Sequence, residues 1–188
     1  MDERLLRESL CHAAHQLWLR GMTPGDSGMI SVACHRRRYL ITPPGHRRSS
    51  LRPEELVVVD VGGLGVNQQG SVDGDLWRPH RIAYQANGYD ADADADEGVA
   101  ATIFAAPPMT VALLRRCRDQ NQIDLPAIGT VGIAATKDEQ SIAKALHESR
   151  MVAIDSEGIL TVGPDLPTVL NAIERLEHAA TIELAASR

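Results

Sequence analysis

The sequence is poor in the features that mark exported, membrane-spanning and nucleic-acid-binding proteins. Its three cysteines share no spacing typical of a metal site and cannot all pair, so reduced thiols are expected. The longest apolar run is interrupted by Pro107 and Pro108 and is too short to span a bilayer. The opening stretch, MDERLLRESL, has no apolar signal core. We therefore expect a cytoplasmic protein that does not interact with membranes.

The charge balance excludes a broad nucleic-acid surface. The net charge is −6, whereas such a surface needs clustered positive charge. Two short basic runs, Arg36–Arg38 and Arg47–Arg48, are typical of solvated turns, and the alternative is a rim that binds anions. With 188 residues and 44% hydrophobic content, the chain is long enough for one filled core and short for two. We expect a single domain over residues 1–188.

Hydrophobic periodicity in the first half predicts one helix followed by short strands. Apolar residues at helical spacing predict a helix over 3–20, with Gly21 as a left-handed stop. Strands are expected over 29–34 and 38–42, and the β-branched run within 53–63 predicts a buried strand that ends in a glycine turn.

The second half mixes helices and strands without strict alternation. The patterns predict helices, strands and a hairpin, together with an acidic, low-complexity surface loop over 89–97. The expected elements are a helix over 78–87 with Pro79 in its first turn, a strand over 98–105, a helix over 108–118, a strand over 127–133, a helix over 138–149, a hairpin over 151–163 and a helix over 165–186. The fold class is therefore α/β or α+β, a sheet covered by helices.

Five segments follow one another along the chain: a first helix that ends in glycine, a Gly-x-Ser-Gly loop at Gly25–Ser31, the Ile-Thr-Pro-x-Gly turn at Ile41–Gly45, the segment Leu51–Asp60, and a last helix with Leu-Glu-x-Ala-Ala. In this order they make the chain similar to the class II aldolase/adducin family, which includes fuculose-phosphate aldolase and ribulose-phosphate 4-epimerase. The resemblance covers nearly the whole chain. It implies a single-domain class II aldolase-like fold with a mainly antiparallel sheet, and a tetramer with sites between subunits.

The metal ligands that the resemblance implies are missing from this sequence. The family's His-x-His pair falls on Ile103 and Ala105, or on Phe104 and Ala106 if the alignment follows the second of two prolines. The third histidine position is Glu157. Zinc in the family needs three imidazoles, so we expect no metal and no other cofactor here.

The family's acid/base position has also changed. In the family a glutamate stands four residues before a helical histidine, and counting back from His80 gives Leu76. The serine pair that precedes this glutamate falls on Gly74 and Asp75. A carboxylate at Asp75 would repel a phosphate rather than bind it.

Part of the family's phosphate-binding loops survives. Ser27, Gly28, Thr42 and Gly45 remain, but Met29 stands where the family has asparagine and offers no hydrogen bond. A phosphorylated sugar is therefore a poor expectation for the ligand. A pocket with a more apolar lining suits a more apolar small molecule, and we expect its substrate-binding residues to be Ser27, Gly28, Met29, Thr42, Gly45, Leu76, Ile103, Phe104 and Ala105.

Three polar residues are candidates for catalysis, each with a structural alternative. Glu157 stands in a tight hairpin, where a solvated carboxylate is as plausible as a buried acid. Asp75 is a candidate cap of the following helix, and His80 a candidate core histidine. If they are catalytic, the protein is a metal-independent lyase, isomerase or cyclase acting on a small carbonyl compound, and a biosynthetic pathway is one setting for such a step. The alternative is an inactive structural or regulatory subunit, as the adducin head is thought to be.

Overall fold

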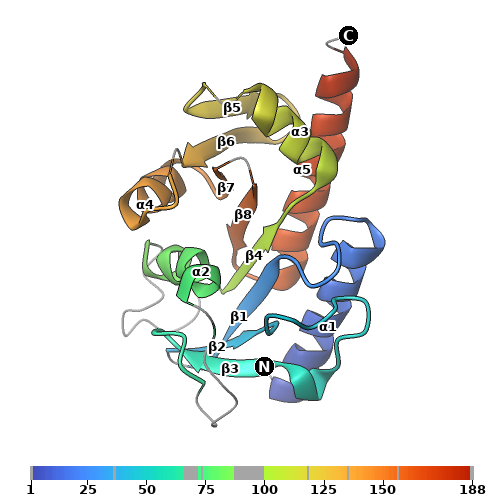
Figure 1. The fold of residues 1–188 in the computed structure, drawn as a ribbon, viewed down its shortest axis with the longest axis vertical. Helices are drawn as coiled ribbons and strands as arrows, with labels where there is room; N and C mark the ends of the chain where they lie inside the picture. The colour runs from blue at the N-terminus through green and yellow to red at the C-terminus, as the bar shows by residue number, and fades with distance from the viewer. Residues whose placement is uncertain are drawn as a thin grey trace.

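The computed structural model describes residues 2–35, 37–65, 72, 74–86, 100–117, 119–134, 136–155 and 157–186, except for the side chain of Asp75. These residues form five α-helices, one 3-10 helix and eight strands (Figure 1). The helices are α1 (Glu3–Leu19), η1 (Pro53–Glu55), α2 (Gly74–Ala86), α3 (Pro108–Arg116), α4 (Glu139–Glu148) and α5 (Leu166–Ala186). The strands are β1 (Met29–His35), β2 (Arg38–Ile41), β3 (Val57–Asp60), β4 (Ala101–Ala105), β5 (Gln122–Leu125), β6 (Gly129–Ala134), β7 (Met151–Ile154) and β8 (Gly158–Gly163).

All eight strands belong to one sheet, in the order β3-β2-β1-β4-β8-β7-β6-β5. Neighbouring strands are antiparallel except β6 and β7, which are parallel. The expected mainly antiparallel sheet covered by helices is therefore confirmed. The acidic segment 89–97 lies outside the described residues.

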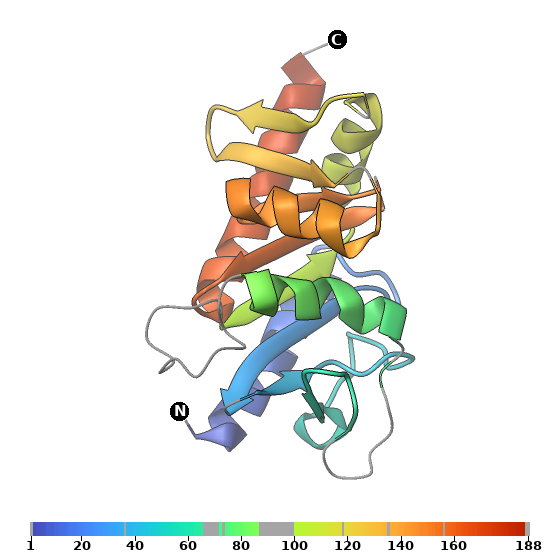
Figure 2. The same ribbon diagram turned by 90° about the vertical axis from the view of Figure 1, so that its left-hand side faces the viewer.

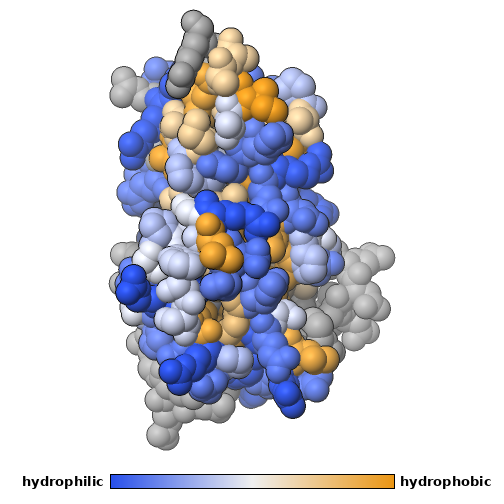
Figure 3. Space-filling view, turned by 90° about the vertical axis from the view of Figure 1, so that its right-hand side faces the viewer, coloured by the Kyte–Doolittle hydropathy of each residue, from blue (hydrophilic) through white to orange (hydrophobic). Residues whose placement is uncertain are grey.

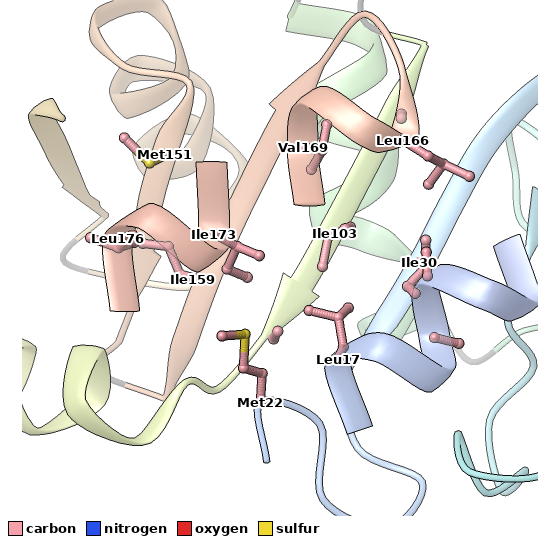
Figure 4. Close-up of a cluster of buried hydrophobic side chains, with 14 of the residues drawn as sticks. Leu17, Met22, Ile30, Ile103, Met151, Ile159, Leu166, Val169, Ile173 and Leu176 are labelled. Carbon is pink, nitrogen blue, oxygen red and sulfur yellow. The ribbon is translucent and has the colours of Figure 1, made fainter. Parts of the chain in front are cut away.

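One face of the sheet packs against α1, α3 and α5. Alternate strand residues, such as Ile30 and Ile103, meet Leu17 of α1 and Ile173 of α5, and all four are almost fully buried (Figure 4). The period of two along each strand places these side chains on one face, and the helical period of 3.6 gives α1 and α5 their apolar stripes.

The other face packs against α2 and α4, which lie next to each other across the strands (Figure 2). Its core includes Trp77 and Tyr84 of α2, which meet Tyr39 of β2 with ring centroids 5.3 and 4.3 Å from the tyrosine ring. Arg81 of α2 and Glu139 of α4 form an ion pair at 3.0 Å that links the two helices. The result is a sheet between two helical layers.

One boundary and one additional strand differ from the sequence-based expectation. Helix α2 begins at Gly74, so Pro79 lies inside the helix rather than in its first turn. Burial of Trp77 against the sheet outweighs the hydrogen bond that a proline cannot donate. Strand β5 was not expected, because four residues give too short a pattern. No helix within the described residues has the length and apolar character needed to cross a membrane.

Candidate active site

The parallel pairing of β6 with β7 brings two turns together at one edge of the sheet. Ala134 at the end of β6 pairs with Ile154 at the end of β7. Lys137 follows β6 in the turn that leads into α4, and Glu157 stands in the hairpin that follows β7. Carboxyl ends of parallel strands meet at the same edge. As a result, Lys137 Nζ donates to Glu157 Oε2 at 2.7 Å.

Each turn has a local cause. Asp138 caps α4 by accepting a hydrogen bond from the backbone N–H of Ser141 at 2.9 Å, and the Thr136 hydroxyl also donates to Asp138. The β7–β8 hairpin turns at Asp155, which has a positive φ of 48°, a conformation that aspartate tolerates better than most residues. The two turns therefore present Lys137 and Glu157 to the same space.

Phe104 lines the inner wall of this space. In β4 it pairs with Leu160 of β8, and its ring lies against the backbone of Gly158. A Cβ atom at Gly158 would lie 2.8 Å from Cζ of Phe104 and 2.6 Å from the carbonyl oxygen of Ala105. Glycine is therefore required for the phenyl ring to occupy this place.

Helix α2 completes a pocket of about 310 Å³. Leu76, Arg78 and Pro79 come from its first half, and the pocket also contains Ile154. The lining is mainly apolar, and its charged residues are Arg78 and the Lys137–Glu157 pair. Both side chains of the pair are a little over half exposed, at 53% and 59%, so they can be reached from solvent.

Three residues that the family resemblance assigned to the site lie together in the structure. Leu76, Phe104 and Glu157 line the same pocket. Ile103 and Ala105 are fully buried on the opposite face of β4, among side chains of α1 and α5 (Figure 4). The sequence left two alignments open for the His-x-His pair. The one that assigns the first position to Phe104 places that position at the pocket.

Asp75 precedes Leu76 in the first turn of α2, and its side chain lies outside the described residues. Nothing in the sequence alone singled out Lys137, Arg78, Pro79 or Ile154. A parallel β6–β7 pairing, had it been recognised, would have placed residue 137 beside residue 157.

His80 lies in the core beneath α2. Its imidazole is fully buried and stacks on Trp77 with ring centroids 5.9 Å apart. Ser31 Oγ lies 2.6 Å from His80 Nδ1 and 2.9 Å from Tyr84 Oη. Burial lowers the pKa of His80 to about 3, so the ring is neutral at ordinary pH.

The two glycine-rich loops, Gly25–Ser31 and Ile41–Gly45, make contacts that stabilise the fold. Thr42 Oγ1 accepts a hydrogen bond from the backbone N–H of Ile30 at 3.0 Å, and Met29 is buried in the core. Gly28 has a φ of 72°, and a Cβ there would lie 2.6 Å from the carbonyl oxygen of Phe104. The loop is thus pressed directly against the strand that carries Phe104. Ser27 Oγ is buried without a hydrogen-bond partner among the described residues, and Gly45 has a φ of 75°.

Arg48 joins these two loops from inside. Its guanidinium donates to the carbonyl oxygens of Asp26 and Gly28 in the first loop, at 3.1 and 2.6 Å, and of Pro43 and His46 in the second, at 3.0 and 2.9 Å. Burial lowers the pKa of Arg48 to about 10, although the charge of Asp26 opposes this shift. The expectation of a solvated turn is therefore wrong for Arg48, which is 1% exposed.

A larger pocket, of about 780 Å³, lies on the other face between α1 and the start of α5. Two of its carboxylates already have partners in the chain. Glu8 pairs with Arg4 at 3.1 Å, and Asp165 accepts a hydrogen bond from the backbone N–H of Thr168 at 2.7 Å. We place the candidate site in the smaller pocket, because Leu76, Phe104 and Glu157, which stand at the family's site positions, line it.

The residues gathered at this site do not fit zinc. Zinc requires three or four nitrogen, sulfur or oxygen ligands, whereas Leu76 and Phe104 offer none and Glu157 is paired with an ammonium group. In the part of the chain that the structure describes, no three His, Cys, Asp or Glu side chains form a group that could hold a metal ion. The expected absence of metal stays a prediction that elemental analysis can test.

This sheet between two helical layers is a class II aldolase fold. The family model of the Class II Aldolase and Adducin N-terminal domain matches residues 8–184, and the chain belongs to this family. Among curated protein sequences, none matches the chain.

Several solved structures are similar to this one. L-fuculose-1-phosphate aldolase from Thermus thermophilus is 21% identical with a TM-score of 0.79, over 98% of this chain and 96% of the aldolase. L-fuculose 1-phosphate aldolase from Glaciozyma antarctica is 18% identical with a TM-score of 0.77, over 99% and 74%. A sugar-phosphate aldolase from Thermotoga maritima is 16% identical with a TM-score of 0.71, over 97% and 93%. At these identities the likeness establishes the fold.

Proposed function

We propose that this member of the class II aldolase superfamily is a metal-independent enzyme that carries out acid–base chemistry on a small, fairly apolar carbonyl compound. The reaction class is that of a lyase, isomerase or cyclase. The observation that carries the proposal is the pocket at the family's ligand positions, where Glu157 and Lys137 face Phe104.

Glu157 is the general acid/base in this proposal. Breaking a bond next to a carbonyl group requires a base that accepts a proton and an acid that returns it, and a positioned carboxylate contributes about 10² to 10⁴-fold. Glu157 is accessible from the pocket and hydrogen-bonded to Lys137. His80 is enclosed in the core, so we assign it a structural role, and Asp75 remains the second candidate.

The lining favours an apolar substrate over a sugar phosphate. Leu76, Pro79, Phe104 and Ile154, four of the seven lining residues, offer no hydrogen bond from their side chains, while Arg78 and the Lys137–Glu157 pair supply the charged groups. The names of the solved relatives, by contrast, point to sugar phosphates. Both classes of compound therefore belong in the same experiment.

The test is hydrogen exchange next to the carbonyl group, measured by proton NMR in D₂O after the protein has been dialysed against a chelator. We expect no stoichiometric zinc by elemental analysis, and exchange into butanone or 2-oxobutanoate faster than into dihydroxyacetone phosphate. Glu157→Gln should lower the rate by about tenfold or more. Glu174→Gln removes an ion-paired carboxylate of α5, outside this pocket, and should leave the rate unchanged.

Faster exchange into the phosphate ester would overturn the apolar assignment, and retention of about one zinc per chain would overturn the metal-free one. Wild-type rates in both Glu157→Gln and Asp75→Asn would show that the acid/base assignment is wrong.

An inactive structural or regulatory subunit is the second candidate. It is favoured by the exposure of Glu157, which pairs with Lys137 as an ordinary surface carboxylate would, and by the enclosure of His80. Under this alternative no carbonyl compound exchanges hydrogen faster with the protein than without it, whatever residue stands at position 157.

A further inference from the structure

Lysine is rare in this chain, and one of its lysines stands at the candidate site. Of the 19 lysine and arginine residues, two are lysines, Lys137 and Lys144, and 17 are arginines. Ion pairs elsewhere on the described surface use arginine, such as Arg4–Glu8, Arg20–Glu174 and Arg81–Glu139. The pair in the pocket uses Lys137.

Stability alone does not account for a lysine at this position. An exposed ion pair contributes little to folding, and arginine would serve as well, since it holds a carboxylate with two parallel hydrogen bonds. What distinguishes lysine is a primary amine that can lose its proton and act as a nucleophile, whereas a guanidinium stays protonated.

The surroundings of Lys137 suit such a nucleophile. Its Nζ lies 2.7 Å from Glu157 Oε2, so the carboxylate is placed to relay protons during a condensation, although the pairing itself favours the ammonium form of the free amine. The amine borders the pocket of about 310 Å³ whose wall is the ring of Phe104. Lys144 lies exposed on α4 and does not line this pocket.

We infer that Lys137 forms an imine with the carbonyl carbon of the substrate. The inference rests on the proposed function and deepens it, because the substrate class becomes aldehydes and ketones that condense with an amine. A protonated imine accepts the electron pair of a breaking neighbouring bond. It would thereby do in this chain what a metal ion does when it polarises a carbonyl oxygen.

The steps balance through Lys137 and Glu157. Glu157 takes a proton from Nζ, the neutral amine attacks the carbonyl carbon, and a new C–N bond forms while the oxygen becomes a hydroxyl group. Protonated Glu157 then donates to that hydroxyl, which leaves as water, and the iminium ion remains. Glu157, ionised again, takes the proton of the neighbouring C–H bond, and the electron pair of that bond moves to the iminium to give an enamine. Where a C–C bond breaks instead, Glu157 takes the proton of the hydroxyl group on the departing fragment, which leaves as a second carbonyl compound. Protonation of the enamine and addition of water return the carbonyl compound and the free amine.

The experiment is reductive trapping. The protein is incubated with butanone or 2-oxobutanoate and sodium cyanoborohydride, and the adduct is located by peptide mass spectrometry. We expect modification of Lys137 about tenfold or more above that of Lys144, because the pocket holds the carbonyl compound beside the first amine and Glu157 can relay the protons of the condensation. Lys137→Arg keeps the positive charge but should abolish both trapping and hydrogen exchange. Lys144→Arg is the matched control and should change neither.

Equal modification of both lysines, or none of Lys137, overturns the imine. If Lys137→Arg also exchanges hydrogen at the wild-type rate while Glu157→Gln does not, the proposed function stands without the imine. Selective trapping on Lys137 with unaltered exchange in Glu157→Gln supports the imine and removes Glu157 as the base. If neither trapping nor exchange occurs with any of the compounds, the imine and the proposed enzyme fall together.

Discussion

At the scale of single residues, burial determines what His80 can do. The imidazole has no exposed surface, its Nδ1 is hydrogen-bonded to Ser31, and its Nε2 has no hydrogen-bond partner among the described residues. Adding a proton there would place a charge in the core without compensation. His80 therefore acts on stability through its protonation state.

We expect His80 to make the fold sensitive to acid. Its folded pKa of about 3 lies below the ordinary value of 6.5, so its contribution is complete above pH 6.5 and is lost as the pH falls toward 3. At about pH 4.5, two units below the ordinary value, the loss is about 3 kcal/mol. His80→Asn keeps a hydrogen-bonding group near Ser31 but cannot titrate.

The measurement is urea unfolding of both proteins between about pH 4.5 and pH 7, which reports the free energy of unfolding directly. The wild type should lose about 3 kcal/mol more than His80→Asn over this range. His147→Asn, which removes an exposed histidine of α4, serves as the control. Parallel curves for wild type and His80→Asn would contradict the expectation.

Single residues of the site were predictable where a motif of the family fixes their distance along the chain from a recognisable residue. Leu76 and Glu157 were placed by counting from His80 and Gly163, and Phe104 by one of two alignments. Arg48 was not, because an arginine that binds four backbone carbonyls has the same local sequence as one in a solvated turn. The number of carbonyl oxygens that converge on a side chain is decided by tertiary structure.

At the scale of elements, α3 depends on a side chain from another helix. Its N-cap residue, Pro107, provides no side-chain hydrogen bond. Instead, the carboxylate of Glu177 in α5 accepts the backbone N–H groups of Met109 and Thr110 at 2.9 and 2.8 Å, and the Thr110 hydroxyl at 2.8 Å. A negative charge at a helix N-terminus also interacts favourably with the helix dipole.

Removing this carboxylate should destabilise the protein. We expect Glu177→Ala to lower the free energy of unfolding by about 1–3 kcal/mol, because it leaves partly buried N–H groups without an acceptor. The free energy of unfolding of Glu177→Gln should lie between those of the wild type and Glu177→Ala, since the glutamine amide has one acceptor oxygen and no charge. Glu174→Ala on the same helix breaks the ion pair with Arg20 and should cost about 1 kcal/mol or less. Urea unfolding measures all three, and an equal loss for Glu174→Ala and Glu177→Ala would refute the assignment.

The elements themselves were largely predictable from local pattern. Long periodic segments such as α1 and α5, and the β7–β8 hairpin, match the expected ranges within one or two residues. The exceptions, β5 and the beginning of α2, depend on partners elsewhere in the chain. The parallel pairing of β6 with β7, which creates the site, has no local signature. The sequence of a strand does not show whether its neighbour in the sheet runs parallel or antiparallel to it.

At the scale of the whole molecule, both faces of the sheet leave large apolar side chains exposed, among them Leu5, Leu19 and Ile182 on the side of α1 and α5. The side that carries α1 and α5 is mostly hydrophilic, and hydrophobic side chains gather toward the end of α5 (Figure 3). On the other face, Leu76 stands at the candidate site with 47% of its surface exposed, beside Arg78 and Pro79 of the same pocket. A large apolar side chain at the mouth of a pocket suits contact with another subunit.

We propose a symmetric homo-oligomer, as the family resemblance implies, with a tetramer as the expected state. Closed symmetry is the default for soluble oligomers, and sites between neighbours would bury Leu76. Sedimentation velocity at micromolar concentration should give a species of four times the 20.4 kDa chain mass.

Leu76→Glu should shift the assembly toward the monomer, because burying a carboxylate at an interface is costly. Leu19→Glu alters a leucine that is 57% exposed at the end of α1, on the other side of the sheet, and should leave the assembly unchanged. A wild-type monomer would remove the oligomer, and a Leu76→Glu tetramer would place the pocket away from the subunit contacts.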